Sequence, residues 1–216
     1  MTQPDFLIRL ALASDVDALT ELHCESFKPE DHVPVMLGRH YVRATYHWLV
    51  TSGMTYVLVV DMDDRIVGLV AVADRSFTGP MFRACKKEFV VSILGNPRLL
   101  LNRKLWERLF RRPDITANGR HIADYTGMAQ MTIGAVDANY RGLAIFPALI
   151  EATRTYSKER GSRAIRAGVY KSNMPSRRVF IKSGWIETTV LETTDTVFYV
   201  SYLDPTFPEE LGIDTK

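Results

Sequence analysis

The segment 131–150 constrains the fold of this chain more than any other part of its sequence. Within it, an apolar stretch at 131–136 leads into a polar turn with Gly142 and Ala144, and Pro147 then opens a helix-forming segment. Small residues at such a junction let the backbone approach a ligand closely. The unpaired amides of the first helical turn, together with the helix dipole, favour an anion such as a pyrophosphate. The pattern predicts a strand, an anion-binding turn and a helix, although many such junctions carry glycine for turn geometry alone.

The rest of the chain alternates between strand-like and helix-like hydrophobic periodicity. Strands are predicted at 6–10, 55–60, 66–72, 130–136, 164–170, 186–192 and 196–203. Helices are predicted at 14–27, 35–50, 81–94, 98–110, from Pro147 to 160, and at 173–184. This order predicts a mixed α/β fold around one sheet, in a single domain spanning 1–216. The irregular stretch 74–128 is interpreted as a helical insertion before the central strand.

Composition and charge argue against several classes of protein. The net charge is only +2, which does not by itself indicate nucleic-acid binding. Cys24 and Cys85 lie far apart without metal-ligand spacing, so neither a zinc site nor a disulfide framework is expected. No apolar run reaches the roughly 20 residues needed to span a membrane, and the N-terminus has no secretory signal pattern. We therefore expect a cytoplasmic protein without a metal and without stable membrane association.

The predicted insertion carries a lopsided charge. Between Lys86 and Arg112, eight Lys and Arg residues stand against only Glu88 and Glu107. This pattern is typical of a solvated helical face. It fits equally well a basic patch that attracts an anionic small molecule, an acidic carrier protein or a membrane surface.

Two spaced motifs stand in the second half of the chain. In the first, Val136 ends a strand, and Arg141, Ala144 and Phe146 follow at the spacing Arg-x-x-Ala-x-Phe. The second, at 173–185, reads Asn-Met-Pro-Ser-Arg-Arg-Val-Phe-Ile-Lys-Ser-Gly-Trp. Together they resemble the acetyl-CoA signature of the GNAT superfamily, Arg/Gln-x-x-Gly/Ala-x-Gly/Ala, and its Asn-x-x-Ala-x-x-x-Tyr-x-x-x-Gly-Phe pattern. Phe146 departs from the usual small residue.

The resemblance is close over 130–185 and implies the GNAT fold, with one central, mixed but largely antiparallel sheet flanked by helices. It also implies acetyl-CoA as co-substrate, with the main chain at Gly134 and Val136 pairing with the pantetheine arm. Asn173 would hydrogen-bond that arm as well as cap a helix, and Phe180 would form an apolar wall near the thioester. The amides that would hold the pyrophosphate belong to Arg141, Gly142, Leu143, Ala144, Ile145 and Phe146.

Two positions depart from the family pattern and leave the general acid and base open. Phe180 stands where many members have a Tyr that protonates the leaving thiolate, and Gln130 stands where a Glu often serves as base. Tyr170 is our first candidate acid, and Asp124 and Tyr125 are candidates for base or orienting group. Each of the three also has a plain structural interpretation, as a strand aromatic or a loop residue.

Polar residues cluster at the end of the first predicted helix, in the region that usually walls the acceptor pocket of the family. They are His23, Glu25, Asp31 and His32. A histidine in such a place can accept a proton near neutral pH. An ordinary exposed helix end would explain these residues equally well.

The resemblance predicts transfer of an acetyl or small acyl group from acyl-CoA to a primary amine of a small molecule, directly in a ternary complex. The basic insertion would suit an anionic acceptor. A longer-chain acyltransferase fed by an acyl carrier protein is a second enzymatic interpretation. A non-catalytic acyl-CoA-binding module and a membrane-surface protein are the non-enzymatic alternatives.

Overall fold

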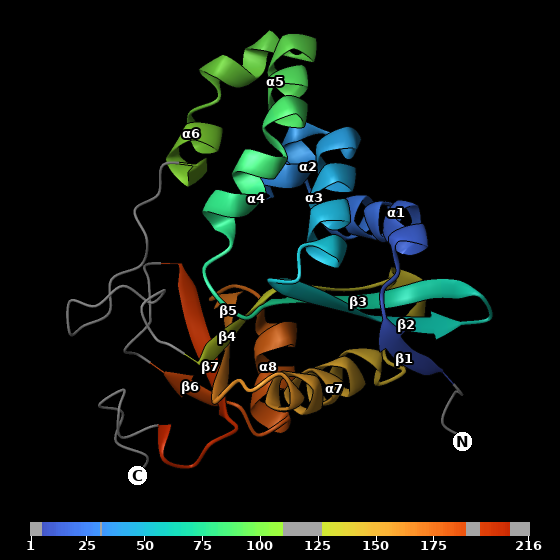
Figure 1. Ribbon diagram of the computed structural model, residues 1–216, viewed down its shortest axis with the longest axis vertical. Helices are drawn as coiled ribbons and strands as arrows, with labels where there is room; N and C mark the ends of the chain where they lie inside the picture. Colours follow the sequence, from blue (N-terminus) through green and yellow to red (C-terminus); the bar gives the residue numbers. More distant parts are fainter. Residues whose placement is uncertain (1–5, 31, 110–126, 189–194, 208–216) are drawn as a thin grey trace.

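The computed structural model describes residues 6–30, 32–109, 127–188 and 195–207. At its centre is a seven-stranded sheet with the order β1-β2-β3-β4-β5-β7-β6 (Figure 1). The strands are β1 (Leu7–Leu10), β2 (Thr55–Met62), β3 (Arg65–Ala73), β4 (Met128–Val136), β5 (Ala164–Tyr170), β6 (Ile186–Thr188) and β7 (Thr196–Tyr202). Every neighbouring pair is antiparallel except β4 and β5, which run parallel. The predicted mixed, largely antiparallel sheet is confirmed.

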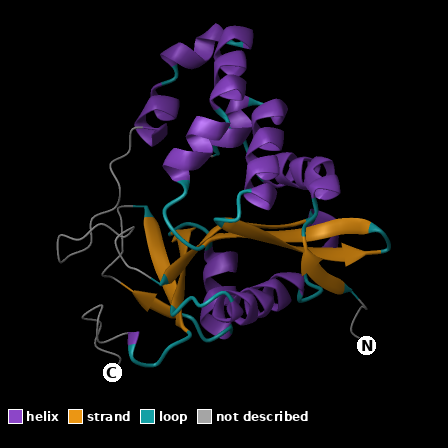
Figure 2. Cartoon of the chain, in the orientation of Figure 1, coloured by secondary structure: helices purple, strands orange, loops and turns teal. Residues whose placement is uncertain are grey.

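Helices cover both faces of this sheet (Figure 2). The α-helices are α1 (Val16–Ser26), α2 (Val33–Leu37), α3 (Arg39–Thr51), α4 (Thr78–Ala84), α5 (Lys86–Gly95), α6 (Arg103–Leu109), α7 (Ile145–Glu159) and α8 (Met174–Lys182). Short 3-10 turns are η1 (Ala13–Asp15), η2 (Pro97–Leu101) and η4 (Ala138–Tyr140). Helices α1 and α3 lie on one face and α7 and α8 on the other, while α4, α5 and α6 stand beyond α2 and α3 (Figure 1).

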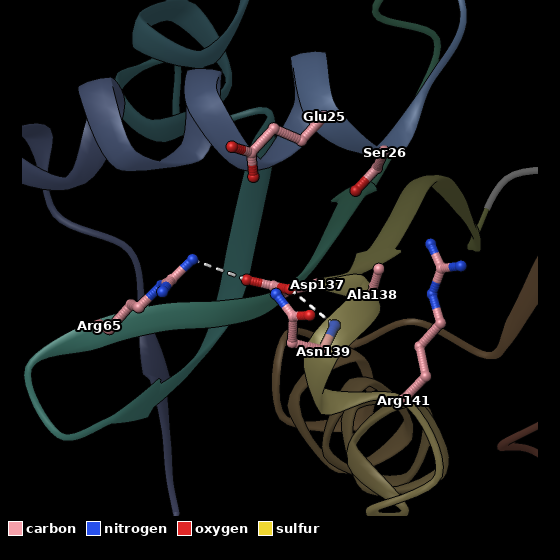
Figure 3. A pocket seen from close by; sticks show the side chains of 7 residues that line it. All are labelled: Glu25, Ser26, Arg65, Asp137, Ala138, Asn139 and Arg141. Carbon is pink, nitrogen blue, oxygen red and sulfur yellow. Dashed lines mark hydrogen bonds and ion pairs between the residues drawn. The ribbon is translucent and has the colours of Figure 1, made fainter.

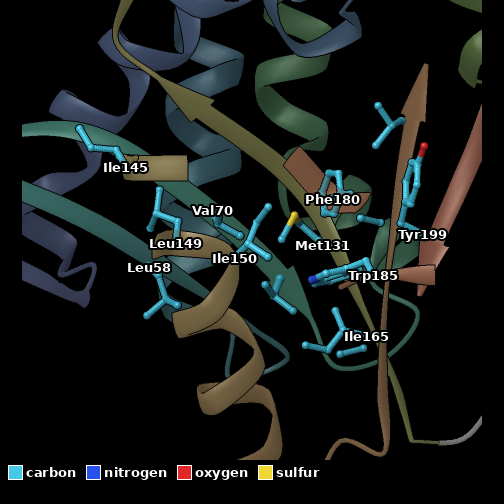
Figure 4. Close-up of a cluster of buried hydrophobic side chains, with 14 of the residues drawn as sticks. Leu58, Val70, Met131, Ile145, Leu149, Ile150, Ile165, Phe180, Trp185 and Tyr199 are labelled. Atoms are coloured by element: carbon cyan, nitrogen blue, oxygen red, sulfur yellow. The ribbon is translucent and has the colours of Figure 1, made fainter. Parts of the chain in front are cut away.

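Each face of the sheet is sealed by its own apolar cluster. Beneath α7 and α8 the cluster includes Leu58, Val70, Met131, Leu149 and Ile165 (Figure 4). The opposite cluster joins the sheet to α1 and α3 and includes Leu19, Tyr46, Leu49, Val57 and Leu69. β2 and β3 are covered on both faces, which accounts for the continuous apolar runs from which these two strands were predicted.

Several predicted helices are divided in the structure. Gly38, at φ +103°, separates α2 from α3, so the single helix predicted at 35–50 is wrong. Cys85 interrupts the helix predicted at 81–94, which is α4 followed by α5. The segment predicted as helix at 98–110 begins as the 3-10 turn η2 and continues as α6 after Asn102. The helix expected to open at Pro147 begins two residues earlier, at Ile145.

The described part of the predicted insertion packs on the helices beside it. A third apolar cluster joins α4, α5, η2 and α6 to α2 and α3 through Leu37, Tyr41, Cys85, Leu99 and Leu105. These contacts place the insertion on the α1/α3 side of the sheet. Neither these helices nor any other in the described ranges is long and apolar enough to cross a membrane.

Candidate active site

The two parallel strands at the middle of the sheet separate part-way along their length. β4 and β5 pair only from Met128 and Ala164 to Met131 and Ala167. The register between β3 and β4 shifts at this point, which leaves Thr132 as the extra residue of a β-bulge. The Thr132 hydroxyl donates to the carbonyl of Ala71 at 3.1 Å and holds the bulge. Beyond it β4 pairs only with β3, so its other edge is open to an extended ligand.

A pocket of about 290 Å³ lies where the strands separate. Of the residues predicted for the site, those that line it are His32, Gly134, Phe146, Tyr170, Asn173 and Phe180. They come from the α1–α2 connection, β4, the start of α7, the end of β5 and α8, so the fold brings distant parts of the sequence to one place. We call this cavity the splay pocket.

Aromatic rings form the inner wall of the splay pocket. Phe180 is buried at 2% exposure and lies parallel to the ring of Tyr199, with centroids 5.3 Å apart. Trp185 packs against its edge, and Phe146 meets it in a T-shaped contact with centroids 5.9 Å apart. Phe180 is thus fixed by neighbours on several sides and presents an apolar surface with no proton to give.

The start of α7 is set against the sheet by two glycines. A Cβ on Gly68 of β3 would lie 2.9 Å from Ile145, and a Cβ on Gly134 of β4 would lie 2.8 Å from the ring of Phe146. Contacts this short exclude any side chain at either position without a shift in the helix or its side chains. The first two residues of α7 therefore rest directly on the backbone of neighbouring strands.

The turn before α7 presents a run of backbone amides beside the helix N-terminus. Gly142 has φ +89° and Ala144 has φ +58°, which turns the chain sharply into the helix. Within the described part of the chain, the amides of residues 142–146 donate to no backbone carbonyl. Pro147 has no N–H, and at this position it removes only a donor that the helix itself would leave unpaired. This concave run of amides at a helix N-terminus is suited to a phosphate group.

An ion pair braces the other side of the same turn. The Asp137 carboxylate, 6% exposed, accepts from Arg65 at 2.9 Å and from the Asn139 amide at 2.9 Å (Figure 3). The Asp137 amide donates to the carbonyl of Val67 on β3 at 2.9 Å, which fixes the turn to the sheet. This arrangement makes the loop from β4 to α7 a rigid support rather than a free connection.

Arg141 stands at the mouth of a second, smaller pocket of about 260 Å³. Its guanidinium is exposed and contacts the carbonyl of Val136 at 3.4 Å. Glu25, predicted to contact the acceptor, lines this second pocket and faces the turn from α1 (Figure 3). The structure therefore separates Glu25 from the splay pocket and places it near the predicted pyrophosphate turn.

Asn173 and Tyr170 lie at the outer end of the splay pocket. The Asn173 side chain accepts from the Ser176 amide at 3.2 Å, which caps α8 as its alternative interpretation predicted. Tyr170 ends β5 and is 46% exposed, so its hydroxyl is accessible to a ligand in the pocket.

The two histidines near the end of α1 form a hydrogen-bonded chain. Nδ1 of His32 lies 3.0 Å from Nε2 of His23, and Nδ1 of His23 lies 2.9 Å from the hydroxyl of Tyr46. His23 is only 1% exposed, so it does not reach the pocket as we expected of an acceptor-binding residue. Burial, followed by the nearby charge of His32, lowers the pKa of His23 to about 3. Burial likewise raises the pKa of Tyr46 well above its ordinary value.

The remaining candidates have other outcomes. Gln130 accepts a hydrogen bond from the buried Arg166 at 2.7 Å, so its amide is engaged within the sheet. Asp124 and Tyr125 lie outside the described residues. The main-chain role expected of Val136 stays a prediction. Among the described residues, no three His, Cys, Asp or Glu side chains are grouped so as to hold a metal ion.

Sequence reasoning missed residues whose roles depend on distant partners. Thr132 forms the bulge, but alternation in 131–136 does not mark where a bulge will fall. Tyr46 and Phe27 support the histidine pair, Phe27 by stacking on His32 with centroids 4.6 Å apart. The spacing of Tyr46 four residues after Val42 is the signal that could have placed its hydroxyl inside, where it needs a partner.

No protein-family model and no curated protein matches this sequence. Solved structures match its fold. PaiA N-acetyltransferase of Thermoplasma acidophilum, in complex with coenzyme A, is 10% identical with a TM-score of 0.59, over 92% of this chain and 99% of that one. Ribosomal-protein-alanine N-acetyltransferase of Brucella melitensis is 18% identical with a TM-score of 0.55, over 91% and 99%. A GNAT-family acetyltransferase of Staphylococcus aureus Mu50 is 15% identical with a TM-score of 0.55, over 93% and 100%. The chain has the GNAT fold.

Proposed function

We propose that this protein transfers an acetyl or similarly small acyl group from coenzyme A to a primary amine of a small molecule. The observation that carries the proposal is the opening between β4 and β5, which leads to the turn before α7, where the amides of 142–146 have no backbone acceptor among the described residues. An extended arm lying along the open edge of β4 would reach both the amides and the splay pocket. The crystal complex of the T. acidophilum enzyme with coenzyme A supports the same ligand class for this fold.

The residues present fit such a donor. Backbone amides at 142–146 would hold the pyrophosphate, and the exposed Arg141 guanidinium would add a charge-assisted contact. The main chain at Gly134 and Val136 would pair with the pantetheine amides, and the Asn173 amide group would donate from the opposite side of the pocket. Single-domain organisation over 1–216 is part of this proposal, with the donor site in 130–185.

The pocket wall favours a short acyl group. Phe146 and Phe180 meet edge to face at the inner end, and Phe146 fills the space above Gly134. A long chain would have to displace these packed rings, at the cost of their buried contacts. Transfer of a longer acyl chain from an acyl carrier protein is therefore less favoured than transfer of a short acyl group. The basic insertion is compatible with either reaction.

Transfer requires that the thioester and the amine be held together with their reacting atoms aligned. Donors on the strand edges would polarise the thioester carbonyl, and exclusion of water by the aromatic wall would strengthen that interaction. Phe180 has no proton to give, so Tyr170, which lines the same pocket, is our candidate to protonate the departing thiolate. The acceptor would enter on the side of α1 and α2.

Turnover tests the proposal. Thiol release from acetyl-CoA is followed against a panel of primary amines, anionic amines included, and we expect at least one to be acylated. Tyr170→Phe should lower kcat by about 100-fold or more, since general acids contribute about 10²- to 10⁴-fold, with acetyl-CoA affinity unchanged. Tyr202→Phe, on a neighbouring strand, is the matched control.

The competing hypothesis is a coenzyme A-binding module without catalysis. It is favoured by the apolar Phe180 and by Gln130, whose side-chain oxygen accepts a hydrogen bond from Arg166. Binding of acetyl-CoA with no thiol release across the whole panel would support it against the transferase. A Tyr170→Phe enzyme with wild-type kcat would remove Tyr170 as the acid while leaving the transfer reaction in place.

A further inference from the structure

The splay pocket holds a second titratable side chain besides Tyr170. Among the described residues that line it, His32 and Tyr170 alone carry an ionisable side chain. They stand on different elements, since His32 precedes α2 and Tyr170 ends β5. A reaction that deprotonates an amine and protonates a thiolate needs one group of each kind.

The backbone and ring of His32 are held in place. Its amide donates to the carbonyl of Lys28 at 3.0 Å, and its carbonyl accepts from Met36 at 3.0 Å. Phe27 stacks on the imidazole at an interplanar angle of 24°. With Nδ1 engaged by His23 at 3.0 Å, the ring orientation is fixed and Nε2 lies on its opposite edge.

His23 is suited to stabilise a positive charge on the imidazole of His32. Burial lowers the pKa of His23 to about 3, so this ring is neutral and can accept a hydrogen bond from a charged neighbour. A neutral imidazole donates at one nitrogen and accepts at the other. When Nε2 of His23 accepts from His32, its Nδ1–H donates to the Tyr46 hydroxyl at 2.9 Å. The charge on His32 would then be stabilised by a chain that ends in the buried core.

We infer that His32 is the proton acceptor for the amine and that His23 and Tyr46 are positioning residues acting through it. This inference rests on the proposed function. As the amine nitrogen bonds to the thioester carbonyl carbon, an N–H proton passes to Nε2 of His32. The C–S bond then breaks with its electron pair on sulfur, and the thiolate takes the proton of Tyr170. Solvent afterwards removes the proton from His32 and restores that of Tyr170.

A spectroscopic measurement tests the proton placement without turnover. In protein carrying ¹⁵N-labelled histidine, imidazole shifts recorded from pH 5 to 9 report the tautomer and titration of each ring. We expect neutral His32 to carry its proton on Nδ1 and to protonate at Nε2, while His23 stays neutral to pH 5. Among the described residues, His23 bonds Nδ1 of His32, Tyr46 bonds His23 in turn, and Tyr170 lines the same pocket, so the pH series must follow these groups together. Neutral His32 with its proton on Nε2 would overturn the inference.

The second test of His32 measures the steady-state kinetics of variants with the amine that the panel identifies as acceptor. His32→Gln keeps a side chain able to bond His23 but cannot take up the proton. It should lower kcat about 100-fold and abolish the acidic limb of the kcat/KM–pH profile, with acetyl-CoA affinity unchanged. Tyr46→Phe should shift that limb with a smaller loss, as a positioning residue would. His47→Gln, an exposed histidine on α3, is the control.

The outcomes separate the two proposals. If the wild type acylates an amine and His32→Gln does so with the same kcat, the role of His32 is overturned and the transferase proposal stands. A wild-type protein that binds acetyl-CoA but acylates no amine overturns both.

Discussion

At the residue scale, Gly134 and Phe146 form the contact that sets the inner dimension of the splay pocket. The ring of Phe146 lies where any side chain at position 134 would stand. The family pattern has a small residue where this chain has Phe146. The structure accounts for the departure, because the glycine opposite provides the space for the ring.

Gly134→Ala should push the Phe146 ring away and disturb the start of α7. We expect a loss of about 1–3 kcal/mol in unfolding free energy, typical of overpacking, and weaker acetyl-CoA binding. Chemical denaturation and calorimetric titration measure the two effects. Adding Phe146→Ala should restore acetyl-CoA affinity, since the clash is then gone. Gly79→Ala, where a Cβ would meet nothing within 4 Å, is the control. Equal effects at 79 and 134 would contradict this account.

Single residues also mark the limit of prediction from sequence. Both histidines were recognised as candidates, but their positions along the chain could not say that one is buried and the other lines the pocket. That division depends on Tyr46, a helix away, and on the stacked ring of Phe27. The sequence alone shows that Gln130 replaces the Glu of the family pattern. Its hydrogen bond to Arg166 could not be predicted, because it depends on the parallel register of β4 and β5.

At the element scale, the sheet was more predictable than the helices. The runs in β2 and β3 are apolar throughout because both faces are covered, and an acidic turn joins them at Asp63 and Asp64, both with positive φ. The apolar face behind the helix predicted at 35–50 runs from Tyr41 to Leu49, after Gly38, so it gave no signal of a break at that glycine. Only the backbone turn at that glycine, φ +103°, divides it.

The strand, turn and helix order at the junction of β4 and α7 was predictable because its signals are local, although α7 begins two residues before the predicted start at Pro147. Glycine, alanine and proline at fixed spacing predict a sharp turn and a helix start whatever the distant contacts. The bulge at Thr132 was not predictable in the same way, since it arises from the pairing of β4 with β3. The separation of β4 from β5 is therefore a property of the sheet and not of either strand alone.

At the scale of the whole molecule, buried His23 should make stability depend on pH. Its folded pKa of about 3 lies below the unfolded value near 6.5, so below pH 6.5 the unfolded chain binds the extra proton. Stability is therefore full above about pH 6.5 and falls as the pH drops, by at most about 1.4 kcal/mol per unit. Ion-paired carboxylates such as Asp15 and Asp204, with lowered pKa values, add their own loss only at lower pH.

Urea denaturation of the wild type between pH 7.5 and 4.5 measures this dependence. In His23→Gln, which cannot titrate, the slope between pH 6.5 and 4.5 should be shallower by up to about 1.4 kcal/mol per unit. Parallel curves for the two proteins would mean that His23 takes up a proton as readily in the folded as in the unfolded protein, which would contradict its burial in the hydrogen-bonded chain with Tyr46.

The account as a whole depends on the turn before α7 receiving the donor's pyrophosphate. Calorimetric titration with acetyl-CoA, on the wild type and on Arg141→Glu, tests this most directly. Lys158→Glu makes the same charge change at the far end of α7 and serves as control. We predict that the wild type and the control bind alike, while Arg141→Glu binds about 10- to 100-fold more weakly because a carboxylate replaces a charge-assisted contact. No binding by the wild type, or equal binding by Arg141→Glu, would contradict the assignment of the site.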